Sequence, residues 1–151
     1  MKTKNYMDQF ATPEEFIRWE VLANRGTRNI VDKSDLLDMV ESHPEAQDRE
    51  LDKLSKAELF DLWIELEGAE AYTDFAVGVS SRSWQLKFGI EHKDVLKMAK
   101  KGFIATTGQV EFRKYGQYLY AKTYSPYDYF RLTPEEVHAW LAANTRRKKN
   151  D

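Results

Sequence analysis

The sequence predicts a mainly helical fold of the α+β class, with a small β-hairpin or sheet toward its C-terminal end. Helix-starting motifs recur along the chain, and one aromatic and β-branched stretch is divided by glycines. The 151 residues suit one compact domain or two very small ones, and 42% apolar side chains suffice for a core. We therefore expect a folded protein rather than a disordered or fibrous one.

The composition excludes several classes of site. Without cysteine, the chain holds no disulfide, thiol nucleophile or cysteine-ligated metal. No run of about 18 apolar residues occurs that could span a membrane. The first residues, MKTKNYMDQFATPEEF, lack the apolar segment and cleavage site of a secretory signal. We expect a cytoplasmic protein with no membrane partner.

Capping motifs predict three helices in the N-terminal half. The motif TPEE at residues 12–15 combines an N-cap, a first-turn proline and a capping-box acid. A second helix is predicted to begin near Asp32 or Ser34 and to end before the His-Pro pair, because the residue preceding proline disfavours helix. The motif SKAE at 55–58 starts a third helix, and a resumed helical period predicts a kinked helix or two helices up to Gly78.

Residues 80–122 predict a helix, a tight turn, a second helix and a hairpin. Ser81 caps the first of these helices and Gly89 ends it, and the second covers His92 to Lys101. The segments FIATTG, VEFRKYG and QYLYAKTY then predict short strands separated by glycine turns. This order is typical of a winged helix-turn-helix. A second TPEE motif, at 133–136, starts the last predicted helix.

These elements divide the chain into four parts. We expect a helix–extended–helix N-terminal region (1–45), an acidic linker (46–53), a winged-helix-like domain (54–144) and a basic tail (145–151). The sequence leaves open whether the two larger parts pack together.

Charge is unevenly distributed along the chain. Residues 1–75 carry nine basic and eighteen acidic side chains, whereas residues 76–132 carry ten basic and four acidic ones. A basic part of this kind indicates contact with nucleic acid, and an acidic part can mask it or bind another protein. A mixed surface with no such role is the alternative.

The predicted second helix of this unit carries a lysine stripe. Lys93, Lys97 and Lys100 share one helical face, and the apolar residues between them, Leu96 included, supply the buried side. Such a helix can enter a major groove or lie along phosphates. The candidate DNA-binding residues are these lysines, their neighbour and the basic residues of the hairpin: Lys93, Lys97, Lys100, Lys101, Arg113, Lys114 and Lys122. A solvated lysine face without a ligand is the alternative.

Six of the eight tyrosines fall between residues 112 and 130. Interleaved with basic residues, they could stack on unpaired bases. We favour a structural or protein-interface role, because half-buried strands and interfaces are rich in tyrosine. Tyr118 and Tyr120 share one strand face and are predicted to close the core.

Signals for catalysis are weak. The histidines, His43, His92 and His138, lack metal-ligand spacing, and the glycines form no phosphate-binding loop. Glu111 with a distant Asp94 matches only part of the carboxylate pattern of metal-dependent nucleases. We predict that the protein is not an enzyme and uses no metal or cofactor.

Two resemblances bear on function. Residues 12–42, TPEEFIRWEVLANRGTRNIVDKSDLLDMVES, resemble the helix–extended–helix module of SAP domains and of the N-terminal domain of termination factor Rho, which implies nucleic-acid binding. Residues 54–141 are similar to small uncharacterised phage and prophage proteins of low-GC Gram-positive bacteria, on the stretches LSKAELFDLW, LKFGIEHKDVLKMAKKGFI, VEFRKYGQYLYA and YFRLTPEEVHAWL. That resemblance implies a mobile-element setting in a bacterial cell and a helix-turn-helix-like fold.

The leading hypothesis is a phage or mobile-element regulator or accessory protein that contacts duplex DNA through the lysine-rich helix and the basic hairpin. The alternative is a protein-binding module that acts on a host protein through the acidic half (residues 1–75) or the tyrosine-rich surface (residues 112–130). A homodimer is compatible with either, since small helix-turn-helix proteins often bind two half-sites.

Overall fold

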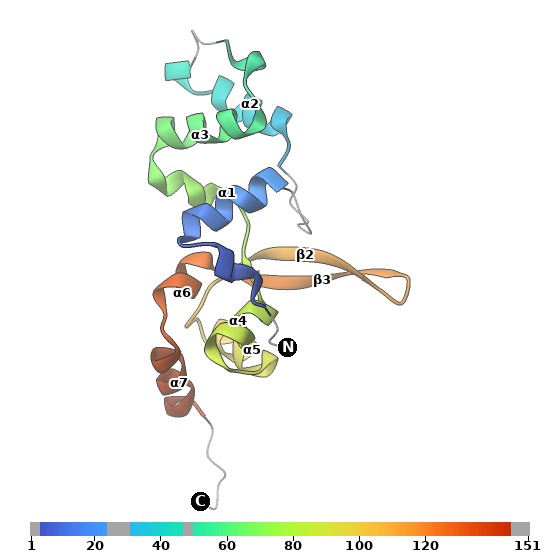
Figure 1. Cartoon of the computed structure of the whole chain (residues 1–151), viewed down its shortest axis with the longest axis vertical. Coiled ribbons are helices and arrows are strands. Elements are labelled where there is room, and N and C mark those ends of the chain that lie inside the picture. The colour runs from blue at the N-terminus through green and yellow to red at the C-terminus, as the bar shows by residue number, and fades with distance from the viewer. Residues whose placement is uncertain (1–3, 24–30, 47–49, 146–151) are drawn as a thin grey trace, which may run out of the picture.

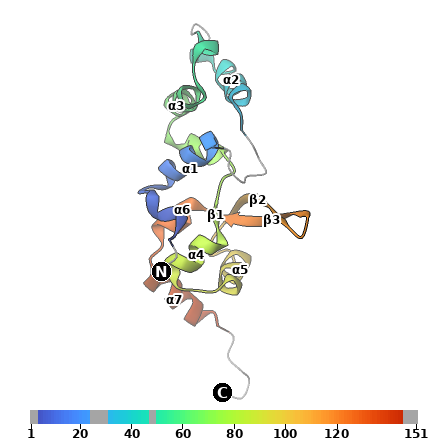
Figure 2. The same ribbon diagram turned by 45° about the vertical axis from the view of Figure 1, so that its right-hand side comes forward.

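The computed structural model describes residues 4–23, 31–46 and 50–145. They form helices and one three-stranded antiparallel sheet, which confirms the mainly helical α+β class (Figure 1). The helices are distributed along an elongated body, in an order that differs from their order in the sequence, as Figure 2 also shows. A hairpin of β2 (Thr106–Lys114) and β3 (Gln117–Tyr124) projects sideways from the middle of this body.

Three helices occupy the N-terminal half: α1 (Pro13–Ala23), α2 (Lys33–Glu41) and α3 (Lys56–Glu67). Their caps confirm the predicted starts, because the first backbone N–H groups of a helix need acceptors. The Thr12 hydroxyl accepts from the Glu15 N–H at 3.1 Å, and Asp32 and Ser55 each begin a complete capping box. The sequence also predicts that Gly26 ends the first helix, but that position lies outside the described residues.

The segment after α3 differs from the predicted helix. A short 3₁₀ helix (Ala69–Asp74) is followed by extended chain that leads into β1 (Val79–Ser80). Packing at Gly78 explains the difference, since a Cβ there would lie 2.1 Å from the Thr107 hydroxyl and 2.4 Å from the Thr123 hydroxyl. The glycine lets this chain approach the sheet closely, and that tertiary contact overrides the local helical period.

The sheet has the strand order β1-β3-β2. Val79 of β1 lies opposite Tyr124, and β3 pairs along its length with β2. The expected break between FIATTG and VEFRKYG is wrong, because Gly108 lies inside β2, at a shift in the register. Backbone proximity requires a glycine there: its Cβ would lie 2.6 Å from the Ala76 carbonyl oxygen.

Two helices lie between β1 and β2 in the sequence, α4 (Ser81–Phe88) and α5 (His92–Lys100). Two more follow β3, α6 (Pro126–Arg131) and α7 (Pro134–Ala143). The predicted α4, α5 and α7 are confirmed, with Ser80 rather than Ser81 as the N-cap of α4. Gly89 ends α4 in the left-handed conformation, with φ 64°. Helix α6 is not predicted from the sequence, because its tyrosines are typical of strands, although Ser125 and Pro126 form an ordinary helix start.

One hydrophobic cluster joins the N-terminal helices to the sheet-bearing part. The Asn5 side-chain amide donates to the Ser83 carbonyl at 3.2 Å and to the Tyr129 hydroxyl at 2.8 Å, and α1 packs on α6. The segment expected to be an acidic linker holds short 3₁₀ helices and buries Ala46 and Leu51. The described parts of the chain therefore share one core.

The β2–β3 loop contains an unfavourable residue. Tyr115 and Gly116 connect the paired Lys114 and Gln117 and have positive φ angles of 54° and 76°. A two-residue hairpin loop of type I′ needs left-handed backbone at both positions, which glycine, asparagine and aspartate adopt most easily. Tyrosine in this conformation costs about 1 kcal/mol.

We predict that Tyr115→Asn raises the free energy of unfolding by about 1 kcal/mol, because asparagine relieves the left-handed strain. Chemical denaturation of the variant and the wild type measures the difference. Tyr115→Val, with a β-branched residue at the same position, should be less stable than the wild type. An asparagine variant less stable than the wild type would contradict the assignment of strain.

Candidate nucleic-acid interface

Helices α4 and α5 form a compact pair joined by a short turn. The rings of Trp84 and Phe88 stack at 5.1 Å between centroids, and α5 buries Val95 and Met98. A hydrogen bond of 2.6 Å between the Ser81 hydroxyl and Nδ1 of His92 connects the first turns of the two helices. The outer side of α5 is thereby fixed relative to α4.

The lysine stripe lies on the side of α5 away from this core. Lys93 and Lys100 are exposed and Lys97 is half-buried, while Lys101 follows as the exposed C-cap. Lys93 forms an exposed ion pair with Glu91 at 3.2 Å, a contact that water weakens. The two lysines of the last turn also complement the helix dipole.

Leu96 does not join the buried side of α5 as expected. Its side chain is 45% exposed and lies three residues after Lys93 and four before Lys100, on the same outward face. Helical geometry accounts for this, since only Val95 and Met98 point directly at the core. The outward face is thus a lysine row with one apolar side chain in it.

The hairpin cations lie along a projecting arm. Lys114 is exposed at the end of β2, with its ammonium 5.4 Å from the Tyr115 ring centroid, and Lys122 is exposed on β3 opposite Gln109. Arg113 lies opposite Tyr118 in the register, and its side chain is outside the described part of the structure. Helices α4 and α5 lie on one side of the hairpin, near its base, in both views (Figure 1 and Figure 2).

The six clustered tyrosines differ in burial. Tyr124 and Tyr129 are buried and Tyr127 is half-buried, whereas Tyr115, Tyr118 and Tyr120 are 91%, 62% and 46% exposed. The prediction that Tyr118 and Tyr120 close the core is wrong, because both side chains are exposed on a part of the hairpin that extends beyond the body and that none of the described helices covers. The alternation of side chains along a strand predicts that the two tyrosines share a face. It does not predict whether another element packs over that face.

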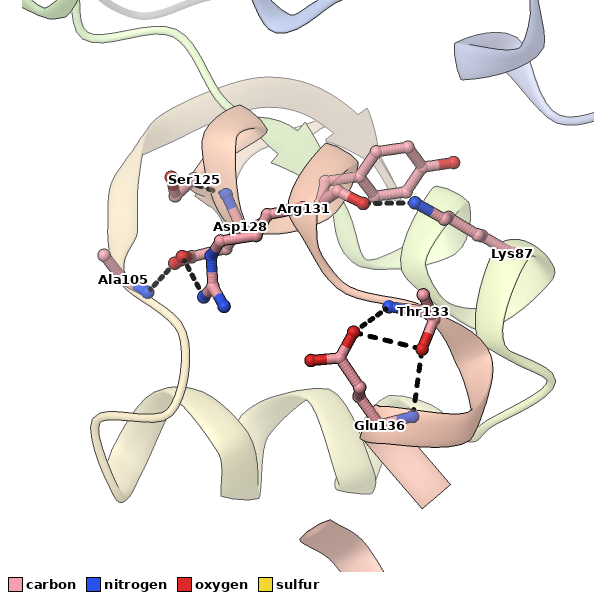
Figure 3. A network of polar contacts seen from close by, with 8 residues as sticks. Lys87, Ala105, Ser125, Asp128, Arg131, Thr133 and Glu136 are labelled. Carbon is pink, nitrogen blue, oxygen red and sulfur yellow. Dashed lines mark hydrogen bonds and ion pairs between the residues drawn. The ribbon is translucent and has the colours of Figure 1, made fainter. Parts of the chain in front are cut away.

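Helix α6 fixes the base of the arm to α4. The Asp128 carboxylate accepts from the Ala105 N–H and from Arg131, both at 2.9 Å (Figure 3). Lys87 of α4 donates to the Tyr129 carbonyl and lies 4.4 Å from the centroid of that ring. Because its ammonium makes these contacts, Lys87 serves the packing of α6 on α4, and burial lowers its pKa.

The described residues hold no cluster of three or more potential metal ligands. Asp94 closes the capping box of α5 by accepting from the Glu91 N–H, and His138 contacts the Phe88 carbonyl. A cavity of about 310 Å³ lies between the 3₁₀ helix at 69–74, the start of β2 and α6, and it is lined by Tyr72, Thr107 and Tyr127 among others. Burial raises the pKa of Tyr72 and Tyr127, and neighbouring carboxylates raise both further.

The chain matches no known protein family, no curated protein and no solved structure. Within the described ranges, no helix has the length and apolar character needed to cross a membrane. Function is therefore inferred from the residues themselves.

Stability should fall between about pH 10 and pH 12 because burial raises the pKa of Tyr129 to about 12 from its ordinary value of 10.0. A group whose pKa is raised by folding contributes stability below its unfolded pKa and loses it as the pH passes its folded pKa. We predict a smaller loss over this range in Tyr129→Phe, measured by denaturation at a series of pH values. An identical pH profile in the two proteins would contradict the burial of this hydroxyl.

Proposed function

We propose that this protein is a DNA-binding protein of the winged helix-turn-helix type and acts as a regulator or accessory factor of a phage or mobile element. The order β1, α4, turn, α5, β2, β3 supports this proposal, together with the sheet order β1-β3-β2. In that arrangement α5 is the helix that enters the major groove and the β2–β3 hairpin is the wing.

The observation that carries the proposal is the outward lysine face of α5 beside a basic hairpin. Lys93, Lys97 and Lys100 lie opposite the buried Val95 and Met98, so the face is available to a polyanion. Each lysine that neutralises a phosphate releases a counterion, which is the main source of affinity for duplex DNA. The contacts would extend to Lys101 and to the hairpin cations.

Recognition by this surface would be mostly contact with the backbone. The outward face of α5 is formed by lysines and Leu96, without the asparagine, glutamine or arginine that read base edges in pairs of hydrogen bonds. Phosphate contacts fix position and carry little sequence information. We therefore expect modest sequence specificity.

The acidic half suits a role away from the DNA. Helices α2 and α3 and the segment between them carry many of the carboxylates that make residues 1–75 acidic. Their placement at one end of the elongated body separates them from α5 (Figure 1). This separation lets a net negative chain present a positive surface to a duplex.

A protein-binding module is the second candidate function. The exposed Tyr118 and Tyr120 favour it, because tyrosine supplies contact area in protein interfaces. Such a factor would act on a host protein through the tyrosine-rich arm or the acidic half. Biological activity that persists in a variant without the α5 lysines would support this candidate.

Replacement of Lys93, Lys97 and Lys100 together by Glu should reduce affinity for a labelled duplex at least about 100-fold, because attraction to phosphates becomes repulsion. Fluorescence anisotropy at low salt measures the affinity. The control replaces the exposed Lys33 and Lys53 by Glu, in the N-terminal half of the chain and away from α5, and its two charge reversals compare with three in the α5 variant. We expect the control to bind within about fivefold of the wild type.

A Gln triple variant at the same α5 positions keeps the test valid if the Glu variant unfolds, since glutamine avoids an unfavourable interaction with the helix dipole. Circular dichroism and thermal melting establish that each variant is folded. Equal loss of affinity in the control and the α5 variant would contradict a defined interface. Unchanged affinity in a folded α5 variant would remove the proposal.

A further inference from the structure

The cavity of about 310 Å³ lies where the N-terminal helices meet the sheet-bearing part of the chain. Its walls come from α1, from the 3₁₀ helix at 69–74 and the extended chain after it, from the start of β2 and from the start of α6. Helices α1 and α6 pack together and lie close to each other in both views (Figure 1 and Figure 2). This volume is at the lower end of the range for pockets that bind small molecules, which often lie between packed parts of a fold.

The walls of the cavity are mainly aromatic and aliphatic. Tyr72 and Phe75 contribute rings from the chain before β1, and Tyr127 contributes a ring from α6. The aliphatic part of the wall includes Ile17, Val77 and Pro126. Such walls favour a ligand with an apolar body, because its contact with them removes apolar surface from water.

The carboxylates at the cavity give it negative charge. Asp74 is the one charged residue among the described lining residues. Burial is the main cause of the raised pKa of Tyr72 and of Tyr127, and the Glu14 carboxylate contributes to both shifts. Glu14 of α1 therefore lies close to both hydroxyl groups, beside the wall that they form.

A cation near this wall is already neutralised. Arg18 of α1 influences Tyr72, and its guanidinium donates to both carboxylate oxygens of Asp61 at 2.9 and 3.0 Å. A bidentate pair of this kind leaves little positive charge for a third group. Within the described residues, no ion pair balances Glu14 or Asp74.

We propose that this cavity binds a small organic cation, with an ammonium group on a compact apolar body. The apolar body would lie against the rings of the wall, and the ammonium would be directed at Asp74 and Glu14. Aromatic faces attract cations, and carboxylates form charge-assisted hydrogen bonds with ammonium groups. The inference goes beyond the proposed DNA-binding function and does not depend on it, since none of the lining residues belongs to α5.

Probes that share a phenyl ring and differ in charge test the class of ligand. At about pH 7, 2-phenylethylamine is a cation, 2-phenylethanol is neutral and 3-phenylpropionate is an anion. Isothermal titration calorimetry with the full chain should give a dissociation constant below about 1 mM for the amine. The neutral and anionic probes should bind at least about tenfold more weakly. Equal affinity for the three probes, or no binding of the amine, would overturn the inference.

A matched pair of variants tests the role of Glu14. The motif TPEE occurs at 12–15 and at 133–136, so Glu14 and Glu135 hold the same position in the first turns of α1 and α7. Glu14→Gln should weaken amine binding at least about fivefold, because it removes negative charge beside the cavity. Glu135→Gln makes the same change in a helix that does not line the cavity and should bind the amine as the wild type does. Equal affinities in the two variants would overturn the assignment of the site.

A further variant and a spectrum test the lining residues themselves. The Asp74 carboxylate accepts from the Trp63 indole N–H at 3.3 Å, and asparagine keeps an acceptor for that bond. Asp74→Asn should therefore remain folded and weaken amine binding at least about fivefold. In NMR spectra of the ¹⁵N-labelled wild type, the amine should shift the backbone amide signals of residues 72–77 and of Tyr127. Shifts confined to other parts of the chain would overturn the inference, whereas loss of DNA binding alone would leave it intact.

Discussion

The arrangement of the C-terminal half depends on one buried aromatic cluster. Trp84 is fully buried and packs against Phe88 of its own helix, Tyr124 of β3 and Tyr129 of α6. Its indole N–H has no hydrogen-bond partner among the described residues, a cost that this close packing has to offset. Asn5 extends the cluster to the N-terminal segment through its bond to the Tyr129 hydroxyl. Trp84 thus joins α4, α6 and the sheet, and Tyr129 connects this cluster to the segment that contains Asn5.

This cluster determines what the outer surface can present. Because α4 is held from inside, α5 packs on it with Val95 and Met98 inward and its lysines outward. The base of the hairpin is held by Asp128, so the arm leaves the body in a fixed direction from beside α5. The proposed DNA surface is therefore a consequence of packing, with a rigid basic helix and a basic arm of which the tip alone is strained.

Local sequence motifs predict most of the helices. They do not predict which surfaces are covered by parts of the chain that are distant in the sequence. The capping motifs at Ser55 and Thr133 are local and predict the helix starts found there, and the start near Asp32 is also predicted, although its capping box is seen only in the structure. The extended chain at Gly78 depends on the hydroxyl groups of Thr107 and Thr123, which are far along the sequence. The spacing of the α5 lysines predicted a shared face, but the exposure of Leu96 and of the arm tyrosines depends on what packs over them.

The most direct test of the account is the salt dependence of duplex binding by the wild-type protein. If the lysine face and the arm bind phosphates, a plot of log affinity against log salt should have a slope between about −3 and −6, because each neutralised phosphate contributes about −0.9. Single-stranded DNA should bind more weakly, since a groove is required for α5. A slope near zero, or no binding at low salt, would contradict the account.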